Sequence, residues 1–389
     1  MFEPLTRVTD RVRPWAAPIP RAGAPEFAVI GAGPAGLATA ALLRRHGVRA
    51  VVFDRSDLVG SSWAARYDSL RLNTVRWMSD LPGLRMERSL GRWVGRDDLV
   101  DYFERYAEHH RLECVLGETG AVDRVDPDGG RWSVLGAAGR RRFAGVVVAT
   151  GHSQQTTVPT WEGHDRFAGR MMHAVDYLRP DDFVGSRVLV VGAGSSGGEI
   201  CVDLAGAGVD VTWAVRSAPR VFPREAVGVP TTPFAPAADA LPDGVANHVA
   251  PWLERRIYGP RDYLPEPATP MMELLAGCKE PMTADGIVES IRTGRVRVVA
   301  AVADLDRSGA LLADGSHVDA DCVISATGYR PGLEPLVGHL DVLADGRPTA
   351  LLPRPGLGFV GFRVPLTGTL WAIERDARRV ATELARRCR

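Results

Sequence analysis

Two glycine-rich turns carry the clearest chemical pattern in this sequence. One occupies residues 31–36 after the apolar run 27–30, and the other occupies residues 192–197 after the apolar run 187–191. In a GxGxxG turn the first glycine allows the tight bend, the second lets the backbone approach a pyrophosphate, and the third lets helix and strand pack closely. The helix that follows presents free N–H groups and a partial positive charge to the phosphates. We expect cofactor contacts from Gly31, Gly33, Pro34, Ala35 and Gly36 in the first copy, and from Gly192, Gly194, Ser195, Ser196 and Gly197 in the second.

The residue at the end of the next strand distinguishes the two turns. Asp54 lies 18 residues after Gly36, where a carboxylate accepts hydrogen bonds from ribose hydroxyls and repels a 2′-phosphate. Arg216 lies 19 residues after the last glycine of the second turn, with Ser217 beside it and Arg224 close behind. A guanidinium there can pair with the 2′-phosphate of NADPH, and a solvated charge at a strand end is the alternative. The first site is therefore expected to bind FAD or NAD and the second NADPH, which indicates hydride transfer from NADPH to FAD.

The elements that position these turns also occur twice. A helix-forming stretch follows each turn, and each unit later has an apolar strand ending in Ala-Thr-Gly, at 149–151 and at 326–328. This internal duplication predicts an α/β fold with two Rossmann-like dinucleotide-binding domains, the NADPH domain being inserted into the FAD domain. The expected divisions are an irregular N-terminal arm at 1–25, an FAD domain at 26–164 plus 326–389, and an NADPH domain at 165–325 whose segment 225–285 borders the substrate entrance.

Composition excludes several other classes of protein. The 47 basic and 47 acidic residues give a formal net charge of zero, which argues against a nucleic-acid partner. The single lysine, Lys279, does not stand in a P-loop motif, and the five cysteines form no CxxC pair. Histidines and cysteines show no metal-ligand spacing, so we expect no metal. No long apolar stretch or apolar leader is present, which predicts a cytoplasmic protein without a membrane partner.

A third motif lies between the two glycine-rich units. Residues 167–177 read Phe-Ala-Gly-Arg-Met-Met-His-Ala-Val-Asp-Tyr, which matches the pattern FxGxxxHxxxY. Together with the two turns, this segment resembles the fingerprint of the flavin-containing monooxygenases. That group includes the YUCCA-type indole-pyruvate monooxygenases, N-hydroxylating enzymes and, more distantly, Baeyer–Villiger monooxygenases. Segments 60–63, 67–72 and 222–224 are also similar to the family, and the resemblance extends from residue 26 to about residue 385.

The resemblance implies an FAD- and NADPH-dependent monooxygenase that forms a C4a-(hydro)peroxyflavin and transfers oxygen from O₂ to a small molecule. Oxygenation at nitrogen or sulfur is the preferred expectation, and Baeyer–Villiger or keto-acid oxygenation is the alternative. A reductase that passes electrons to a protein partner is a rival of another class, as is a redox sensor without turnover. The predominance of arginine over lysine is typical of GC-rich genomes and suggests bacterial specialised metabolism. A homodimer is possible.

The resemblance also assigns roles to individual residues. Asn73 stands where flavin-containing monooxygenases carry an asparagine beside the flavin, whereas YUCCA-type members usually have histidine there. His173 is the fingerprint histidine, which lies near the nicotinamide cofactor in the family. Asn73 and His173 are therefore the candidate catalytic residues, with a turn residue and a structural linker histidine as the alternatives. Further cofactor contacts are expected from Arg55, Ser62, Trp63, Arg71, Leu72, Val122, Ala149, Thr150, Gly151, Ser217, Arg224, Thr327, Gly328 and Tyr329.

Overall fold

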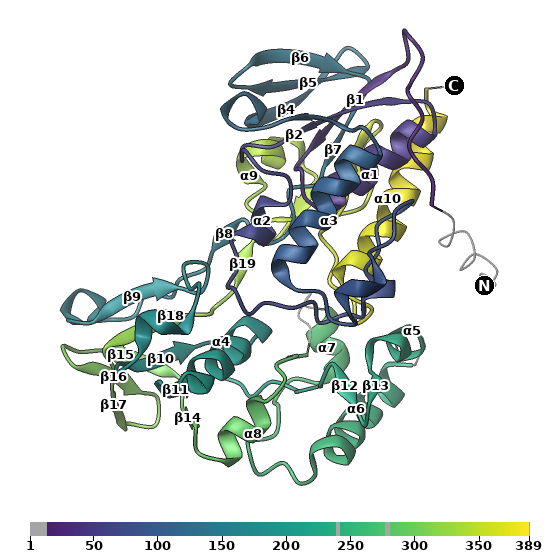
Figure 1. Ribbon diagram of the computed structural model, residues 1–389. Helices are drawn as coiled ribbons and strands as arrows, with labels where there is room; N and C mark the ends of the chain where they lie inside the picture. The colour runs from purple at the N-terminus through teal and green to yellow at the C-terminus, as the bar shows by residue number, and fades with distance from the viewer. Residues whose placement is uncertain (1–13, 239–241, 277–280, 389) are drawn as a thin grey trace.

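The chain forms two lobes, each built on a five-stranded sheet whose strands all run parallel (Figure 1). The computed structural model describes residues 14–238, 242–276 and 281–388. The start of the expected arm, residues 1–13, therefore lies outside the described residues, as does Lys279. The two parallel sheets confirm the α/β fold with two Rossmann-like units.

The sheet of the first lobe has the strand order β22-β7-β1-β2-β3. Its strands are β1 (Glu26–Ile30), β2 (Arg49–Phe53), β3 (Glu113–Val115), β7 (Gly145–Val148) and β22 (Leu357–Phe359). The apolar runs of β1 and β7 are buried because helices or other strands cover both faces of a parallel sheet. The helices of this lobe are α1 (Pro34–Arg45), α2 (Ser61–Ala64), α3 (Arg96–His109), α9 (Glu334–Val337) and α10 (Thr369–Arg386).

The sheet of the second lobe has the order β14-β11-β10-β18-β9. Its strands are β9 (Arg170–His173), β10 (Arg187–Val191), β11 (Asp210–Ala214), β14 (Val296–Val299) and β18 (Cys322–Ser325). Helices α4 (Ser195–Gly206) and α8 (Ile287–Arg292) pack together beside this sheet. The chain thus completes this second sheet with residues 170–325 before it returns to the first lobe for β22 and α10.

Each lobe also carries a three-stranded antiparallel sheet at the same point of its topology. In the first lobe it comprises β4 (Val122–Asp128), β5 (Arg131–Gly136) and β6 (Gly139–Phe143). In the second it comprises β15 (Val302–Leu305), β16 (Gly309–Leu312) and β17 (His317–Asp319). Both sheets precede the strand that ends in Ala-Thr-Gly, so the duplication extends beyond the glycine-rich turns.

Two short strands join the lobes. The chain passes to the second lobe through β8 (Gln155–Thr156) and returns through β19 (Tyr329–Arg330). These strands pair antiparallel, with Tyr329 opposite Thr156 (Figure 1). Both Ala-Thr-Gly segments lie close to this crossing in sequence. Their alanines lie beside the first glycine of each glycine-rich turn, so the crossing is near both turns. The small hairpin β20 (Leu343–Ala344) and β21 (Arg347–Pro348) follows in the first lobe.

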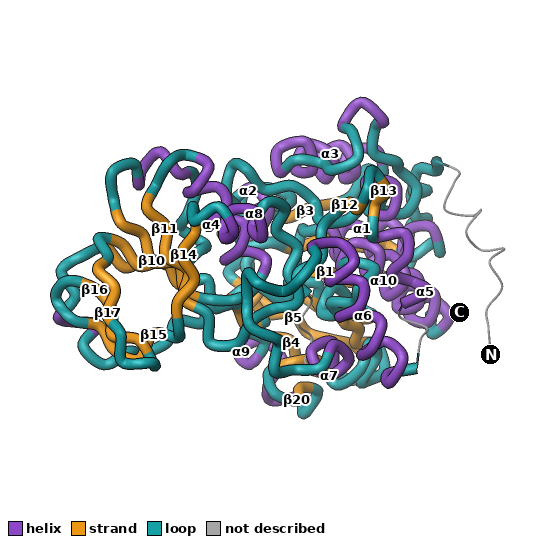
Figure 2. The backbone as a smooth tube through the Cα atoms, turned by 90° about the horizontal axis from the view of Figure 1, so that it is seen from below, coloured by secondary structure: helices purple, strands orange, loops and turns teal. Residues whose placement is uncertain are grey.

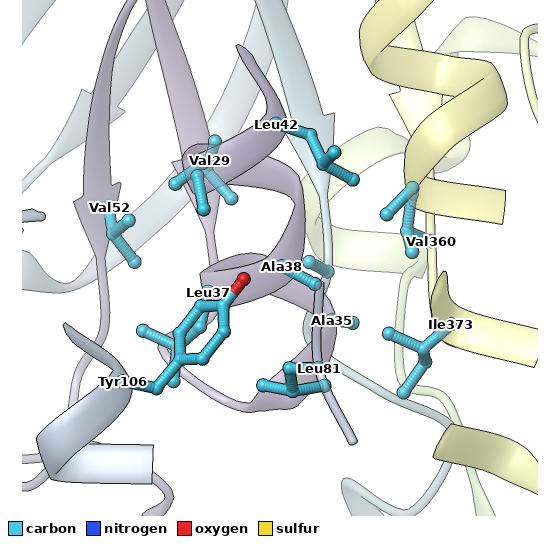
Figure 3. Close-up of a cluster of buried hydrophobic side chains, with 14 of the residues drawn as sticks. Val29, Ala35, Leu37, Ala38, Leu42, Val52, Leu81, Tyr106, Val360 and Ile373 are labelled. Atoms are coloured by element: carbon cyan, nitrogen blue, oxygen red, sulfur yellow. The ribbon is translucent and has the colours of Figure 1, made fainter. Parts of the chain in front are cut away.

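The core of the first lobe surrounds α1, whose Leu37, Ala38 and Leu42 are fully or almost fully buried (Figure 3). This helix packs against α10, where Ile373 belongs to the same cluster. Tyr106 of α3 is also fully buried in the cluster. Because the first turn leads directly into α1, the same packing that stabilises the lobe fixes the orientation of the turn.

The insert at 225–285 contributes Tyr263, Leu264 and Met282 to the core of the second lobe, and its helices lie below the first lobe (Figure 1 and Figure 2). Its described elements are β12 (Glu225–Ala226), β13 (Val229–Pro230), α5 (Ala235–Ala238), α6 (Asp243–Tyr258) and α7 (Met271–Ala276). Glu254 of α6 is buried and accepts hydrogen bonds from Val221 N (3.0 Å), Arg220 (3.2 Å) and Tyr263 Oη (3.0 Å). Arg261 also pairs with Glu254. One carboxylate therefore anchors the insert to the segment that follows β11.

The described part of the N-terminal arm is irregular, and it lies along the first lobe. Trp15 N donates to Gly83 O (2.9 Å), and Ala17 N donates to Nδ1 of the buried His110 (3.0 Å). The guanidinium carbon of Arg45 lies 4.7 Å from the centre of the Trp15 ring. These contacts join the arm to the C-terminal ends of α1 and α3.

Candidate active site

The first glycine turn is sterically constrained at two of its three glycines. Gly31 has a φ of +112°, and a Cβ there would lie 2.5 Å from the carbonyl oxygen of Ala149. A Cβ on Gly36 would lie 1.8 Å from the carbonyl oxygen of Gly31. A Cβ on Gly33 would meet nothing within 4 Å. The protein itself therefore requires the first and third glycines and leaves open space at the second.

The second turn repeats this arrangement. Gly192 has a φ of +128°, and its Cβ would lie 2.2 Å from the Ala326 carbonyl oxygen. A Cβ on Gly197 would lie 2.3 Å from the Gly192 carbonyl oxygen, whereas a Cβ on Gly194 would meet nothing within 4 Å. Both second glycines are helix N-caps without a side-chain hydrogen bond, and neither helix has an acidic residue in its first turn. Open space beside uncapped N–H groups fits a pyrophosphate in each lobe.

Asp54 is hydrogen-bonded to the first turn. Its Oδ2 accepts from Ala32 N (2.7 Å), and its Oδ1 accepts from Ser56 N (2.9 Å). The carboxylate is half-buried, so part of it remains accessible beside the turn. A fixed acceptor at the end of β2 is suited to ribose hydroxyls.

Arg216 occupies the corresponding position of the second lobe but is exposed. The last residue of β11, Ala214, accepts a hydrogen bond from Gly192 N of the turn (3.2 Å). Arg216 lies two residues after this contact. Ser217 beside it is also exposed. In the described chain Arg216 has no ion pair or side-chain hydrogen bond. An exposed guanidinium at this edge is accessible to a 2′-phosphate.

The crossing between the lobes gathers three side chains. The His173 and Tyr329 rings are 5.0 Å apart in an edge-to-face arrangement, and Arg66 Nη1 donates to Tyr329 Oη (2.7 Å). Thr327 and Gly328 precede Tyr329, and Thr327 Oγ1 donates to the Thr157 carbonyl at the other crossing strand. The predicted residues 327–329 and His173 therefore come together, whereas the contribution of Arg66 was missed because it belongs to no motif.

His173 is buried and is held as a neutral ring. Its Nδ1 accepts a hydrogen bond from Val175 N (3.1 Å), so the ring proton is on Nε2. Burial lowers the pKa of His173, and the Gly328 carbonyl opposes this effect. A neutral imidazole whose acceptor nitrogen is already used is a hydrogen-bond donor here, which is consistent with a positioning residue as well as a catalytic one.

Asn73 is connected to the second lobe. Its Oδ1 accepts a hydrogen bond from Arg224 Nε (3.0 Å), and its main-chain oxygen accepts from Thr232 Oγ1 (3.4 Å). Asn73 comes from the first lobe, between β2 and α3, and Arg224 immediately precedes the insert. The structure therefore brings together two predicted site residues that are 151 positions apart.

Polar partners that no motif identified extend this connection. The Tyr67 hydroxyl donates to Glu199 of α4, and Tyr177 Oη donates to Asp203 Oδ2 (2.7 Å). Burial raises the pKa of Tyr67, and the negative charge of Glu199 adds to the effect, so the phenol stays protonated. Tyr67, Glu199 and Asp203 line a cavity of about 120 Å³, and its other walls are Ser69, Val202, Arg224 and Asp285.

Thr150 lies at the end of the first Ala-Thr-Gly segment, next to Gly151. Its hydroxyl is buried and has no hydrogen-bond partner among the described residues. Ala149 before it contacts the first glycine turn. An unpaired hydroxyl at the carboxyl edge of the sheet is consistent with a ligand that supplies the missing partner.

The remaining predicted cofactor contacts lie around the first turn at different depths. Leu72 is buried in the core of the first lobe, and Trp63 packs near Phe103 with ring centres 6.4 Å apart. Arg71 is exposed, and its Nη1 donates to Trp93 O (3.2 Å). The others are Arg55, which donates to Gln154 (2.8 Å), Ser62, which is exposed, and Val122, which begins β4.

Burial keeps the thiols of the described cysteines protonated. Cys114, Cys201, Cys322 and Cys388 are free thiols, and burial raises the pKa of Cys114 and of Cys322 to about 11. Such thiols stay protonated at neutral pH and are poor nucleophiles. Within residues 14–238, 242–276 and 281–388, no cluster of three His, Cys, Asp or Glu side chains could hold a metal ion. No helix in the same residues is long and apolar enough to cross a membrane.

Comparisons with known proteins agree with this geometry. The chain is 35% identical over 313 residues to indole-3-pyruvate monooxygenase YUCCA1 of Oryza sativa subsp. japonica, covering 79% of this chain and 77% of the relative. It is 32% identical over 376 residues to a probable indole-3-pyruvate monooxygenase, YUCCA3 of Arabidopsis thaliana, covering 92% and 86%. The fold is similar to a flavin-containing monooxygenase from Stenotrophomonas maltophilia, with a TM-score of 0.71, 26% identity, and coverage of 94% and 99%. Residues 24–340 match the FMO-like family, described as flavin-binding monooxygenase-like, so the chain belongs to that family.

Proposed function

We propose that this flavoprotein monooxygenase, which uses FAD and NADPH, oxygenates a small molecule at nitrogen or sulfur. The observation that carries the proposal is the repeated turn geometry: of its three glycines, each turn leaves open space only at the second, and each offers uncapped helix N–H groups. When bound, the two cofactors supply hydride transfer and the activation of O₂. A reductase that serves a protein partner is not favoured by the family.

The proposed division of the cofactors follows from the two strand-end residues. FAD binds in the first lobe, where Asp54 accepts from the ribose hydroxyls, and NADPH binds in the second, where Arg216 pairs with the 2′-phosphate. The proposed domains are 26–164 plus 326–389 for FAD and 165–325 for NADPH. Support comes from the two parallel sheets, whose strands separate along these ranges.

Residues of both lobes then border the reacting region. Asn73 donates its amide hydrogens there, and His173 donates from Nε2 at the crossing of the lobes. The insert at 225–285 covers the substrate entrance, because its residues Thr232 and Glu225 contact Asn73 and Arg92 of the first lobe, respectively. Such a cover excludes water, which protects reactive oxygen chemistry from loss to peroxide.

The cavity that Arg224 helps to line favours a neutral or cationic substrate. Three carboxylates line it, from Glu199, Asp203 and Asp285, and one cation, Arg224. Arg224 is already close to two of those carboxylates, at 3.6 Å each. An anionic substrate would therefore meet excess negative charge in this cavity, whereas an amine would be attracted.

A keto acid is the second candidate, because the two curated relatives are named as monooxygenases of indole-3-pyruvate. Arg71, an exposed cation two residues before Asn73 in the sequence, is the residue we assign to the carboxylate of such a substrate. A cytoplasmic location, a role in bacterial specialised metabolism and a homodimer stay predictions from the sequence.

Isotopically labelled O₂ distinguishes these candidates. The purified protein is first titrated anaerobically with NADPH and with NADH, and we expect NADPH to bleach the flavin at lower concentration. Labelled O₂ is then added with a thioether, a secondary amine or an aryl-pyruvate. Label in a sulfoxide or hydroxylamine supports the proposal. Label only in the carboxylic acid formed from the aryl-pyruvate supports the second candidate, and peroxide with every substrate rejects both.

A further inference from the structure

Arg224 contacts the first lobe, although its sequence position suggests a contact with the nicotinamide cofactor. Its side chain is 12% exposed and extends to the first lobe, where Nε donates to Asn73 Oδ1 at 3.0 Å. The exposed Arg216, eight residues earlier, remains at the end of β11. Arg224 is therefore enclosed by protein groups and Arg216 is exposed, although the sequence places both after the turn and β11 of the second unit.

Carboxylates hold Arg224 in this orientation. Its Nη2 lies 3.6 Å from Glu199 Oε1, and its Nε lies 3.6 Å from Asp285 Oδ2. Asp285 also accepts from the main-chain nitrogen of Arg224 at 3.1 Å. Glu199 is held in turn by the Tyr67 hydroxyl. The guanidinium is thus fixed and its charge is compensated, which makes it a poor ligand for a further anion.

The contact decides which way the Asn73 carboxamide faces. A guanidinium only donates hydrogen bonds, so Asn73 must present its oxygen to Arg224 and its NH₂ group to the opposite side. No described residue accepts a hydrogen bond from this NH₂ group. If the amide rotated, two donors would face each other in a half-buried site, at a cost comparable to a lost charge-assisted hydrogen bond.

We propose that Arg224 is a positioning residue that orients Asn73 as a hydrogen-bond donor toward the reacting oxygen. This inference rests on the proposed function, in which Asn73 borders the reacting region. Because Arg224 immediately precedes the insert and Asn73 belongs to the first lobe, the orientation of the amide requires the insert to lie against residues 67–73. Arg224 then links the position of the insert to the donor that the oxygen chemistry needs.

The test uses the NADPH-dependent formation of peroxide without substrate, in which NADPH, H⁺ and O₂ give NADP⁺ and H₂O₂. We expect Arg224→Met and Asn73→Ala each to accelerate this reaction by roughly tenfold, which corresponds to about 1.4 kcal/mol. The double variant should be no faster than either single variant, because both changes remove the same oriented donor. Arg224→Lys, which retains a donor and a charge, should recover part of the wild-type rate.

A binding measurement separates positioning from phosphate recognition. The Kd of NADP⁺ is measured from the absorbance change of the oxidised flavin in FAD-loaded protein. We expect Arg224→Met to change this Kd less than twofold, whereas the matched variant Arg216→Ala should raise it by roughly tenfold or more. FAD content and melting temperature are measured for every variant as controls for folding.

Three outcomes would overturn the inference. A rise in Kd for Arg224→Met equal to that for Arg216→Ala would make Arg224 a phosphate ligand. Additive effects in the double variant would show that Arg224 does not act through Asn73. Unchanged peroxide formation in Arg224→Met would remove its role altogether. None of these results depends on a substrate, so failure of the N- or S-oxygenation assay is distinguishable from failure of this inference.

Discussion

The two dinucleotide units share a steric design and differ in how their strand-end residues are held. In the first unit, Asp54 is tied to the turn through Ala32 N and Ser56 N. In the second unit, Arg216 is exposed without a side-chain partner in the described chain. A fixed carboxylate is suited to a cofactor that stays bound, and an exposed guanidinium is suited to one that must bind through its phosphate.

The two units also differ in what covers them. The N-terminal segment around Trp15 and Ala17 docks on the helices of the first unit. The insert is anchored to the second unit through Glu254, and its Thr232 donates to the main-chain oxygen of Asn73 in the first unit. The duplicated turns are therefore the constant part of this molecule, and the additions to each unit distinguish their proposed roles. The following substitutions test this contrast.

The largest effect is expected from the third glycine of the first turn. Gly36→Ala places a methyl group 1.8 Å from the Gly31 carbonyl oxygen, so the turn cannot close. We expect a loss of stability of about 3 kcal/mol or more and little FAD in the purified protein. Gly33→Ala is the matched control, because its methyl group meets no protein atom. It should keep the melting temperature of the apoprotein and lower only FAD affinity; equal melting losses for both variants would refute the steric argument.

The anchor of the insert ranks second. The side chains of Arg220 and Arg261 are 9% and 4% exposed. Glu254→Leu removes the carboxylate that they share and leaves both cations buried without it. Unpaired buried charge typically costs on the order of 3 kcal/mol. Chemical denaturation should show this loss, and limited proteolysis should cut first within the insert while the first lobe stays protected. Protection of the insert equal to wild type would show that Glu254 is not its anchor.

A smaller, selective effect is expected for Arg216→Ala. Losing one charge-assisted contact with the 2′-phosphate should lower the ratio of kcat/KM for NADPH to that for NADH by roughly 10- to 100-fold. Because the side chain is exposed, the melting temperature should stay the same. Steady-state kinetics with both nucleotides measure the ratio. An unchanged ratio would assign the phosphate to another residue and would remove the proposed contrast between the two units.

The smallest effect concerns the arm on the first unit. Burial lowers the pKa of His110 to about 4, below its usual 6.5, with a smaller contribution from neighbouring His109. As the pH falls, His110 is protonated at a higher pH in the unfolded chain than in the folded one. The free energy of unfolding therefore has its full value above pH 6.5 and decreases as the pH drops from 6.5 toward 4. We expect a loss on the order of 1–2 kcal/mol over this window. His110→Asn retains an acceptor for Ala17 N without titrating, so its melting temperature should vary less with pH; an identical slope would exclude His110 as the cause.

Short-range pattern was sufficient to predict much of the fold. The turns at 31–36 and 192–197 predict the strand before and the helix after each of them, because a GxGxxG sequence between an apolar run and a helix-forming stretch is typical of a dinucleotide-binding turn. Repetition of the Ala-Thr-Gly segment then indicated two units and their order. The partner of Arg224 could not be predicted in the same way, since Asn73 lies 151 residues away and no local rule specifies which lobe a long side chain reaches.

The sequence by itself determined the two parallel α/β units, their strand-end Asp54 and Arg216, and membership of a flavin-dependent family. Those features depend on glycine stereochemistry and on apolar periodicity, which act between close neighbours along the chain. Only the tertiary structure decided that Arg66 and His173 both contact Tyr329, that Glu254 anchors the insert, and that Arg224 faces Asn73. These contacts depend on how two lobes and an insert pack, because hydrogen-bond direction and burial are settled only when distant segments meet.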